Sequence, residues 1–174
     1  MRTVLFRMCW RQGLLVYFFR MTERRKGAGI YVSNTLLAMQ KFAAWYRSKL
    51  PVRIIGITGS VGKTTTKEMI AAVLETKYRT VKTYKNLNSQ IGVALMMFEL
   101  DEDTELAVIE MGISMPGEMD RLVEMVKPEC AVLTNIGVSH MEIWAQEKTS
   151  AKKKERLLVI FRMAVRCLPA ATEM

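Results

Sequence analysis

A glycine-rich run that follows a β-branched apolar stretch constrains this chain more than any other feature. Residues 52–57 are typical of a buried strand, and the run Gly56-Ile-Thr-Gly-Ser-Val-Gly-Lys-Thr-Thr-Thr66 overlaps its end. A helix is predicted to begin at about Lys63. A strand, a glycine-rich turn and a helix N-terminus form a cradle for phosphate, because backbone N–H groups and the helix dipole both favour an anion there. The sequence therefore predicts an α/β fold with a phosphate-binding loop (P-loop).

The residues of this loop have separate expected roles. Lys63 would reach the β- and γ-phosphates of a nucleotide, and the Thr64 hydroxyl would ligate Mg²⁺. The strict P-loop pattern has a glycine five residues before Gly62, but Ile57 occupies that position and the glycine is Gly59. A glycine-rich turn with a solvated lysine is the alternative, and the strand before the loop and the helix after it favour phosphate binding. The expected nucleotide-binding residues of the loop are Gly59, Ser60, Val61, Gly62, Lys63, Thr64 and Thr65.

Strands and helices are predicted to alternate through the rest of the chain. Before the loop we expect a short strand at 29–32 and a helix that Ser33 or Asn34 caps and Pro51 closes off. The helix after the loop is expected at 63–77. Further strands are predicted near 80–83, 106–111 and 130–136, and further helices near 90–98, near 118–126 and from about residue 146. The apolar residues expected to face inward from the helix at 63–77 are Met69, Ile70, Val73 and Leu74. Such alternation predicts right-handed βαβ units and a mostly parallel sheet flanked by helices.

The formal net charge of +9 is concentrated at the two ends of the chain. Residues 1–26 contain seven Lys and Arg against one acidic residue, and residues 152–174 contain six against two, whereas 27–151 contain thirteen against fourteen. We therefore expect no nucleic-acid partner, because a near-neutral core lacks a basic binding face. The apolar run at 14–19 is bracketed by arginines and is far shorter than the roughly 20 residues that cross a bilayer. We expect no membrane insertion, with a surface anchor as the alternative.

The three cysteines, Cys9, Cys130 and Cys167, are widely spaced and show no metal-binding pattern. An odd number at such spacing argues against a disulfide framework. The composition therefore favours a reducing, cytoplasmic compartment.

Three motifs occur in one order along the chain: Thr58-Gly-Ser-Val-Gly-Lys-Thr-Thr-Thr66, Glu110-Met-Gly-Ile-Ser-Met-Pro-Gly-Glu118 and Thr134-Asn-Ile-Gly-Val-Ser-His140. Together they resemble the central ATP-binding domain of the Mur ligase family, most closely its MurF-type members. The resemblance extends over about residues 27–155. It implies an ATP-dependent ligase of peptidoglycan precursor synthesis that phosphorylates a carboxylate and then forms an amide. For MurF-type members the implied substrates are ATP, UDP-MurNAc-tripeptide and D-Ala-D-Ala.

The resemblance also implies roles for particular residues. Glu110 would bind Mg²⁺, His140 would bind a second metal ion, and Asn88 would lie near the γ-phosphate. Lys154 matches a lysine that becomes carbamylated, although Lys152 and Lys153 leave the register open. The implied catalytic residues are Lys63, Glu110, His140 and Lys154. Asn135 is a secondary candidate. For each of these side chains the alternative is a structural or solvated position.

The domain organisation expected from the resemblance is incomplete. Residues 1–26 and 162–174 match nothing in the family, 27–50 resemble the end of its UDP-sugar-binding domain, and 51–161 resemble part of its central domain. We therefore expect a truncated or frameshifted chain with little or no ligase activity alone. The alternatives are another Mur-type ligase, a folylpolyglutamate synthase-like ligase and a non-catalytic nucleotide-binding module.

Overall fold

Two β-sheets are formed by the residues that the computed structural model describes, namely 6–9, 15–20, 30–115 and 117–135. The larger sheet is parallel, with strand order β5-β6-β4-β7. Its strands are β4 (Arg53–Thr58), β5 (Thr80–Lys82), β6 (Leu106–Glu110) and β7 (Cys130–Leu133). In the smaller sheet, β2 (Leu15–Arg20) pairs antiparallel with β1 (Phe6–Cys9) and parallel with β3 (Ile30–Val32). The predicted parallel sheet is confirmed.

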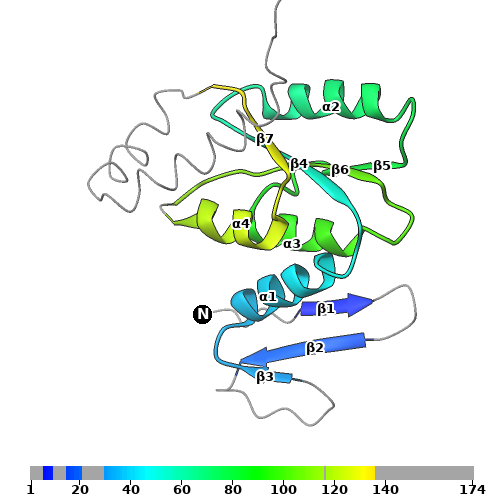
Figure 1. Cartoon of the computed structure of the whole chain (residues 1–174). Helices are drawn as coiled ribbons and strands as arrows, with labels where there is room; N and C mark the ends of the chain where they lie inside the picture. The colour runs from blue at the N-terminus through cyan, green and yellow to red at the C-terminus, as the bar shows by residue number, and fades with distance from the viewer. Residues whose placement is uncertain (1–5, 10–14, 21–29, 116, 136–174) are drawn as a thin grey trace, which may run out of the picture.

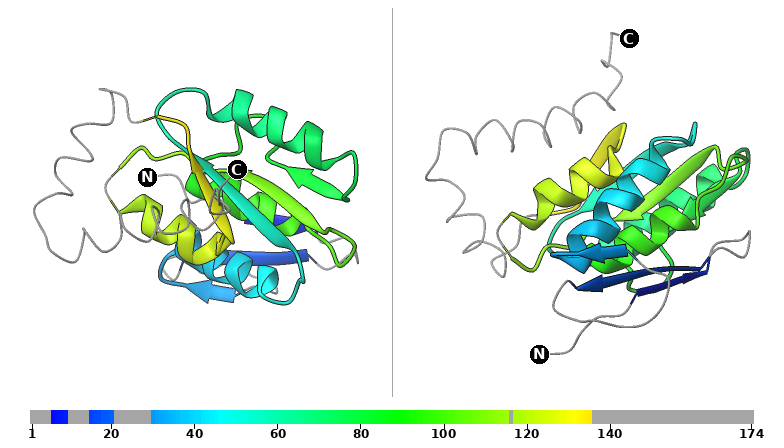
Figure 2. Two further views of the ribbon diagram at one scale, coloured as in Figure 1. Left: turned by 45° about the horizontal axis from the view of Figure 1, so that its top comes forward. Right: turned by 90° about the horizontal axis from the view of Figure 1, so that it is seen from below.

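Helices cover both faces of the larger sheet (Figure 1). The helices are α1 (Thr35–Arg47), α2 (Lys63–Leu74), α3 (Gln90–Phe98) and α4 (Glu118–Val126). α2 lies on one face, whereas α3 and α4 lie on the other, and α1 packs against α3 and α4 on their far side (Figure 2). Because both faces are covered, every residue of β6 is buried, as expected for a strand inside a parallel α/β sheet.

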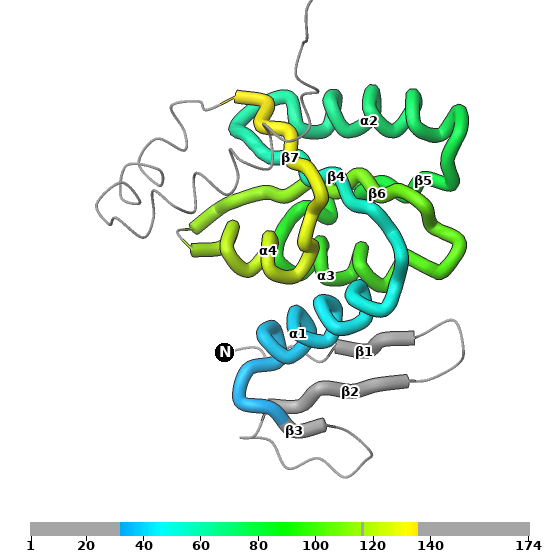
Figure 3. Tube along the Cα trace, viewed as in Figure 1, coloured from blue at the N-terminus to red at the C-terminus, as the bar shows by residue number. Residues whose placement is uncertain are grey.

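α1 shares its core with the parallel sheet. Met39 and Ala43 are fully buried in the same apolar cluster as Ile54 and Ile109 of the central strands. Arg47 at the end of α1 donates from Nε to the carbonyl of Val126 at 2.9 Å. The chain then passes directly from α1 into β4 (Figure 3). The assignment of residues 27–50 to a preceding domain stays a prediction, but their helix packs as part of this unit.

The inward face of α2 differs from the prediction. Its buried and half-buried residues recur at i, i+3, i+4, i+7, i+8 and i+11, a single helical face, and they are Lys63, Thr66, Lys67, Ile70, Ala71 and Leu74. Met69 and Val73 lie on the opposite side, 67% and 70% exposed. The prediction that these two residues face inward was therefore wrong, because a lysine and an alanine complete the stripe that contacts the sheet. The helix also ends at Leu74, and 75–77 form a turn.

The predicted elements near 29–32, 80–83, 90–98, 106–111 and 118–126 are confirmed to within one or two residues, whereas the strand predicted at 130–136 is shorter. Asn34 is the N-cap of α1, with its side chain accepting from the Leu37 N–H at 3.0 Å. β7 ends at Leu133, and residue 136 and the helix predicted from about residue 146 lie outside the described residues. Within the described part of the chain, no helix has the length and apolar character needed to cross a bilayer.

Candidate functional site

The loop between β4 and α2 contains two glycines in a backbone conformation that other residues rarely adopt. Gly59 has φ +131° and Gly62 has φ +86°, which glycine tolerates because it lacks a Cβ. Gly62 is the N-cap of α2, and no side chain caps that helix. Since the first N–H groups of any helix lack partners within it, this end of α2 offers donors to an anion. The loop therefore has the two positive-φ glycines and the uncapped helix start that a phosphate cradle needs, and phosphate binding itself stays a prediction.

Lys63 folds back over its own loop. Its Nζ donates to the carbonyl of Gly59 at 2.7 Å and to that of Ser60 at 3.3 Å. The ammonium group is thus held at the loop, where phosphate oxygens could replace these two carbonyls.

The end of β7 supports the loop from the side. Asn135 accepts from the Ser60 N–H at 3.0 Å through its carbonyl and from the Val61 N–H at 2.9 Å through Oδ1. Thr134 donates from Oγ1 to the carbonyl of Val61 at 2.6 Å. Two amides of the loop are therefore engaged by protein. Thr134 was missed from the sequence, although its place at the end of a strand was a usable signal.

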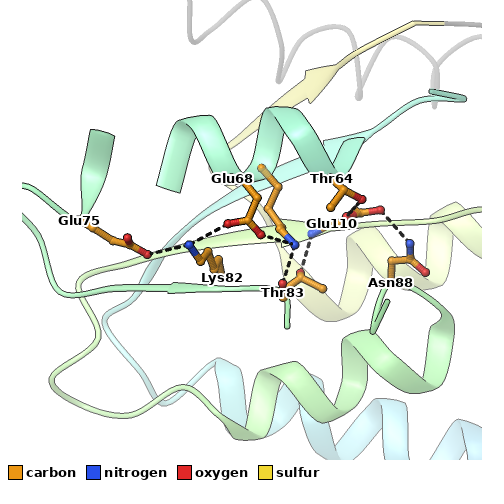
Figure 4. Close-up of polar contacts among 8 residues, drawn as sticks. Thr64, Glu68, Glu75, Lys82, Thr83, Asn88 and Glu110 are labelled. Carbon is orange, nitrogen blue, oxygen red and sulfur yellow. Dashed lines mark hydrogen bonds and ion pairs between the residues drawn. The ribbon is translucent and has the colours of Figure 1, made fainter. Parts of the chain in front are cut away.

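Three residues that lie far apart in the sequence meet at the end of β6. Glu110 is buried, with 2% of its surface exposed. Its Oε2 accepts from the Thr64 hydroxyl at 3.0 Å and its Oε1 from the Asn88 Nδ2 at 2.8 Å. Figure 4 shows the Glu110 carboxylate between these two side chains. The structure thus places the predicted metal-ligating carboxylate beside the first turn of α2.

The oxygen atoms at this point suit a magnesium ion. Mg²⁺ prefers hard oxygen ligands and commonly takes only one or two from the protein, with water and phosphate completing an octahedron. The Glu110 carboxylate and the Thr64 hydroxyl supply such a pair. Among the described residues there is no group of three His, Cys, Asp or Glu side chains that could hold a metal. An ion held here would therefore depend on the nucleotide and water for its other ligands.

Two predicted site residues cannot be placed. His140 and Lys154, with its neighbours Lys152 and Lys153, lie outside the described residues. Their proposed roles stay predictions.

A buried lysine behind Glu110 was missed from the sequence. Lys67 is 1% exposed, and its Nζ donates to the carbonyl of Thr83 at 2.8 Å and pairs with Glu68 at 3.0 Å. Glu68 also pairs with Lys82 at 2.9 Å, and hydrogen bonds from Lys82 and then Lys67 lower its pKa. No signal in the sequence marked it, because the charge of a lysine favours the solvent side of a helix.

The loop that follows β6 is held by Glu118. Its Oε2 accepts from the N–H groups of Ser114 at 2.7 Å and Met115 at 3.0 Å, and its Oε1 accepts from Gln90 Nε2 at 2.7 Å. Burial alone raises the pKa of Glu118, but these three hydrogen bonds and the positive charge of Arg121 together lower it by more, so the pKa lies below its ordinary value.

Comparison with known families and structures gives one consistent result. The Mur ligase middle domain matches residues 57–164. The UDP-N-acetylmuramoyl-tripeptide–D-alanyl-D-alanine ligase of Bacillus subtilis is 47% identical over 131 residues, covering 75% of this chain and 29% of that protein. The enzyme of the same name from Escherichia coli is 38% identical over 125 residues, covering 72% and 28%.

Two solved structures are also similar. MurF from Acinetobacter baumannii superposes with a TM-score of 0.66 at 34% identity, covering 84% of this chain and 32% of that one. MurF from Thermotoga maritima in complex with ADP gives a TM-score of 0.67 at 29% identity, covering 82% and 33%. The chain spans 29% and 28% of the lengths of the two curated relatives.

Proposed function

Because the chain belongs to the Mur ligase family, matched through its middle domain, we propose that it binds ATP as the Mg²⁺ complex through residues 59–65, Asn88 and Glu110. The observation that supports this most directly is the 3.0 Å contact between the Thr64 hydroxyl and the buried Glu110 carboxylate, directly after a phosphate loop. The relative from Thermotoga maritima, which was solved with ADP, gives independent support.

Different residues of the chain would bind different parts of the Mg²⁺–ATP complex. The Lys63 ammonium would exchange its two loop carbonyls for β- and γ-phosphate oxygens. Thr64 and Glu110 would hold Mg²⁺, which when bound neutralises charge on the phosphates. Asn88, which now donates to Glu110, would orient the carboxylate or contact the γ-phosphate. His140 and Lys154 are proposed to complete the metal-binding surroundings, as the family resemblance implies.

For a protein of the relatives' full length we propose ATP-dependent amide formation. The free carboxylate of UDP-MurNAc-tripeptide would attack the γ-phosphorus of ATP, forming an acyl phosphate and releasing ADP. The amine of D-Ala-D-Ala would then displace phosphate to give the amide. This substrate pair follows from the names of the curated relatives. We infer a cytoplasmic location from the widely spaced cysteines.

Nucleotide binding by the 174-residue chain tests the site. ATP affinity would be measured by calorimetry with and without Mg²⁺ for the natural sequence, Lys63→Ala, Glu110→Gln and Lys77→Ala. Charged hydrogen bonds are worth about 1.5–3 kcal/mol, so Lys63→Ala should weaken binding roughly 10- to 100-fold. Glu110→Gln should weaken binding only when Mg²⁺ is present.

Lys77→Ala is the matched control, because Lys77 is an exposed lysine beyond the end of α2. It should bind ATP like the natural sequence. Failure of the natural chain to bind ATP, or equal losses in Lys63→Ala and Lys77→Ala, would contradict the proposed site.

A further inference from the structure

The hydrogen-bond ladder between β5 and β6 changes partners at Thr83. The Thr83 N–H donates to the carbonyl of Val108 at 3.0 Å, as regular parallel pairing requires. In a regular parallel ladder the next bond would run from the Glu110 N–H to the Thr83 carbonyl. Instead the Glu110 N–H donates to the Thr83 hydroxyl at 2.8 Å, and the Thr83 carbonyl accepts from Lys67 Nζ at 2.8 Å. The threonine hydroxyl thus replaces a backbone carbonyl, and a lysine takes up the carbonyl that is released.

The burial of Lys67 is costly unless its charge is well satisfied. Its ammonium group has the Thr83 carbonyl at 2.8 Å and the Glu68 carboxylate at 3.0 Å. Glu68 is itself held by Lys82, which also pairs with Glu75 at 3.3 Å. Figure 4 shows Thr83 between this ion-pair network and Glu110. An apolar residue would fill the inner face of α2 at lower cost, so packing alone does not account for a lysine here.

We propose that Lys67 and Thr83 are positioning residues for Glu110. This inference rests on the proposed function, because it concerns the carboxylate assigned to Mg²⁺. Lys67 holds the Thr83 peptide group away from the regular ladder, and the Thr83 hydroxyl then fixes the N–H of Glu110, the last residue of β6. The side chain of Glu110 leaves the backbone at this fixed peptide and reaches Thr64 and Asn88. In the described structure, Thr83 bonds the backbone N–H of Glu110, and Lys67 bonds the carbonyl of Thr83.

Hydrogen exchange at the Glu110 amide tests this positioning without any ligand. The variants are Thr83→Val, which removes the hydroxyl at nearly constant shape, and Thr83→Ser, which keeps it. Losing a buried hydrogen bond should speed exchange at Glu110 by roughly tenfold relative to the Val108 amide in Thr83→Val. Thr83→Ser should restore the natural rate. Val108 serves as the internal reference for global unfolding.

Thr104→Val is the matched control. Thr104 is also 1% exposed and bonds Asp101 through its hydroxyl at 2.7 Å, but it lies before β6 at the opposite end of the strand. It should lower stability without changing the ratio of the Glu110 and Val108 exchange rates. An unchanged ratio in Thr83→Val would overturn the inference.

The Mg²⁺ dependence of ATP binding is the second readout. In Lys67→Met and Thr83→Val the half-saturating Mg²⁺ concentration should rise about tenfold, while metal-free ATP affinity should change by less than about threefold. Thr83→Ser and Thr104→Val should match the natural chain. Equal losses with and without Mg²⁺ would indicate a purely structural role and reject the inference.

The two proposals fail in different ways. If the natural chain shows no Mg²⁺-dependent ATP binding, the proposed function fails, and the exchange measurement still decides whether Thr83 positions Glu110. If ATP binding is normal in Thr83→Val, only the positioning role fails. Should Lys67→Met not fold, the comparison of Thr83→Val with Thr83→Ser remains decisive.

Discussion

Replacing Gly59 with alanine tests how the phosphate loop is seated against the end of β7. Gly59 has φ +131°, and a Cβ there would overlap Thr134 Oγ1 and lie 2.9 Å from the carbonyl oxygen of Asn135. Because the Asn135 atoms near the added Cβ belong to the backbone, rotating a side chain cannot relieve the clash. Gly117 provides a matched control, because it also has a positive φ, +78°, but no described atom lies within 4 Å of its added Cβ.

The expected loss of stability has two parts. An alanine in a sparsely populated backbone region costs about 1–3 kcal/mol. Moving Thr134 also breaks its 2.6 Å bond to the Val61 carbonyl, which costs about 1 kcal/mol more. We therefore expect Gly59→Ala to lower the free energy of unfolding by about 3 kcal/mol. Gly117→Ala should show backbone strain alone, about 1–2 kcal/mol.

Urea unfolding followed by circular dichroism measures both variants, and ATP titration measures the loop. Gly59→Ala should be the less stable of the two and should also bind ATP more weakly, because the displaced Asn135 holds the Ser60 and Val61 amides. Gly117→Ala should keep its ATP affinity. Equal unfolding midpoints for the two variants would refute the argument that the loop is packed tightly against β7.

Two further predictions concern Glu118 and the faces of α2. The pKa of Glu118 lies below its ordinary value of 4.5, so its stabilising contribution is present above that pH and is lost as the pH falls through the folded-state pKa. Urea unfolding at pH 7 should therefore show Glu118→Gln to be about 1 kcal/mol less stable than the natural chain. At acidic pH the difference in the free energy of unfolding should be smaller. An equal difference at acidic pH would show that the charge of Glu118 does not contribute to stability. On α2, Met69→Lys should change the free energy of unfolding, measured by thermal unfolding, by less than about 0.5 kcal/mol. Ala71→Leu should lower it by about 1–3 kcal/mol through overpacking. A larger loss in Met69→Lys than in Ala71→Leu would instead support the inward orientation that the sequence predicted for Met69.

Much of the fold follows from local sequence patterns. The β-branched apolar run at 52–57 and the apolar run at 106–109 predict buried strands, and the glycines at 59 and 62 predict the turn between strand and helix. Ser33 or Asn34 predicts the start of α1 by capping chemistry, and the structure has Asn34 as the N-cap. The meeting of Glu110 with Thr64 also follows, because the carboxyl ends of parallel strands and the N-termini of the following helices lie at one edge of a sheet.

Three-dimensional packing accounts for what the sequence did not reveal. α2 contains two apolar stripes, one through Met69 and Val73 and one through Ile70 and Leu74, and hydrophobicity alone does not choose between them. The stripe that contacts the sheet includes Lys67, whose charge argues for the solvent side until its partners Thr83 and Glu68 are known. The hydroxyl of Thr83 replaces a backbone acceptor only because β5 leaves the ladder at that residue.

The packing of α1 has a practical consequence for anyone who trims this protein. Met39 and Ala43 of α1 are buried in the main apolar core, and Arg47 bonds the carbonyl of Val126 at the C-terminal end of α4. The sequence suggests a domain boundary at Pro51. A fragment that starts there would lack α1, expose the part of the apolar core that α1 covers, and should self-associate. A fragment starting at Asn34 would keep α1 over the apolar core and would retain the N-cap residue of that helix.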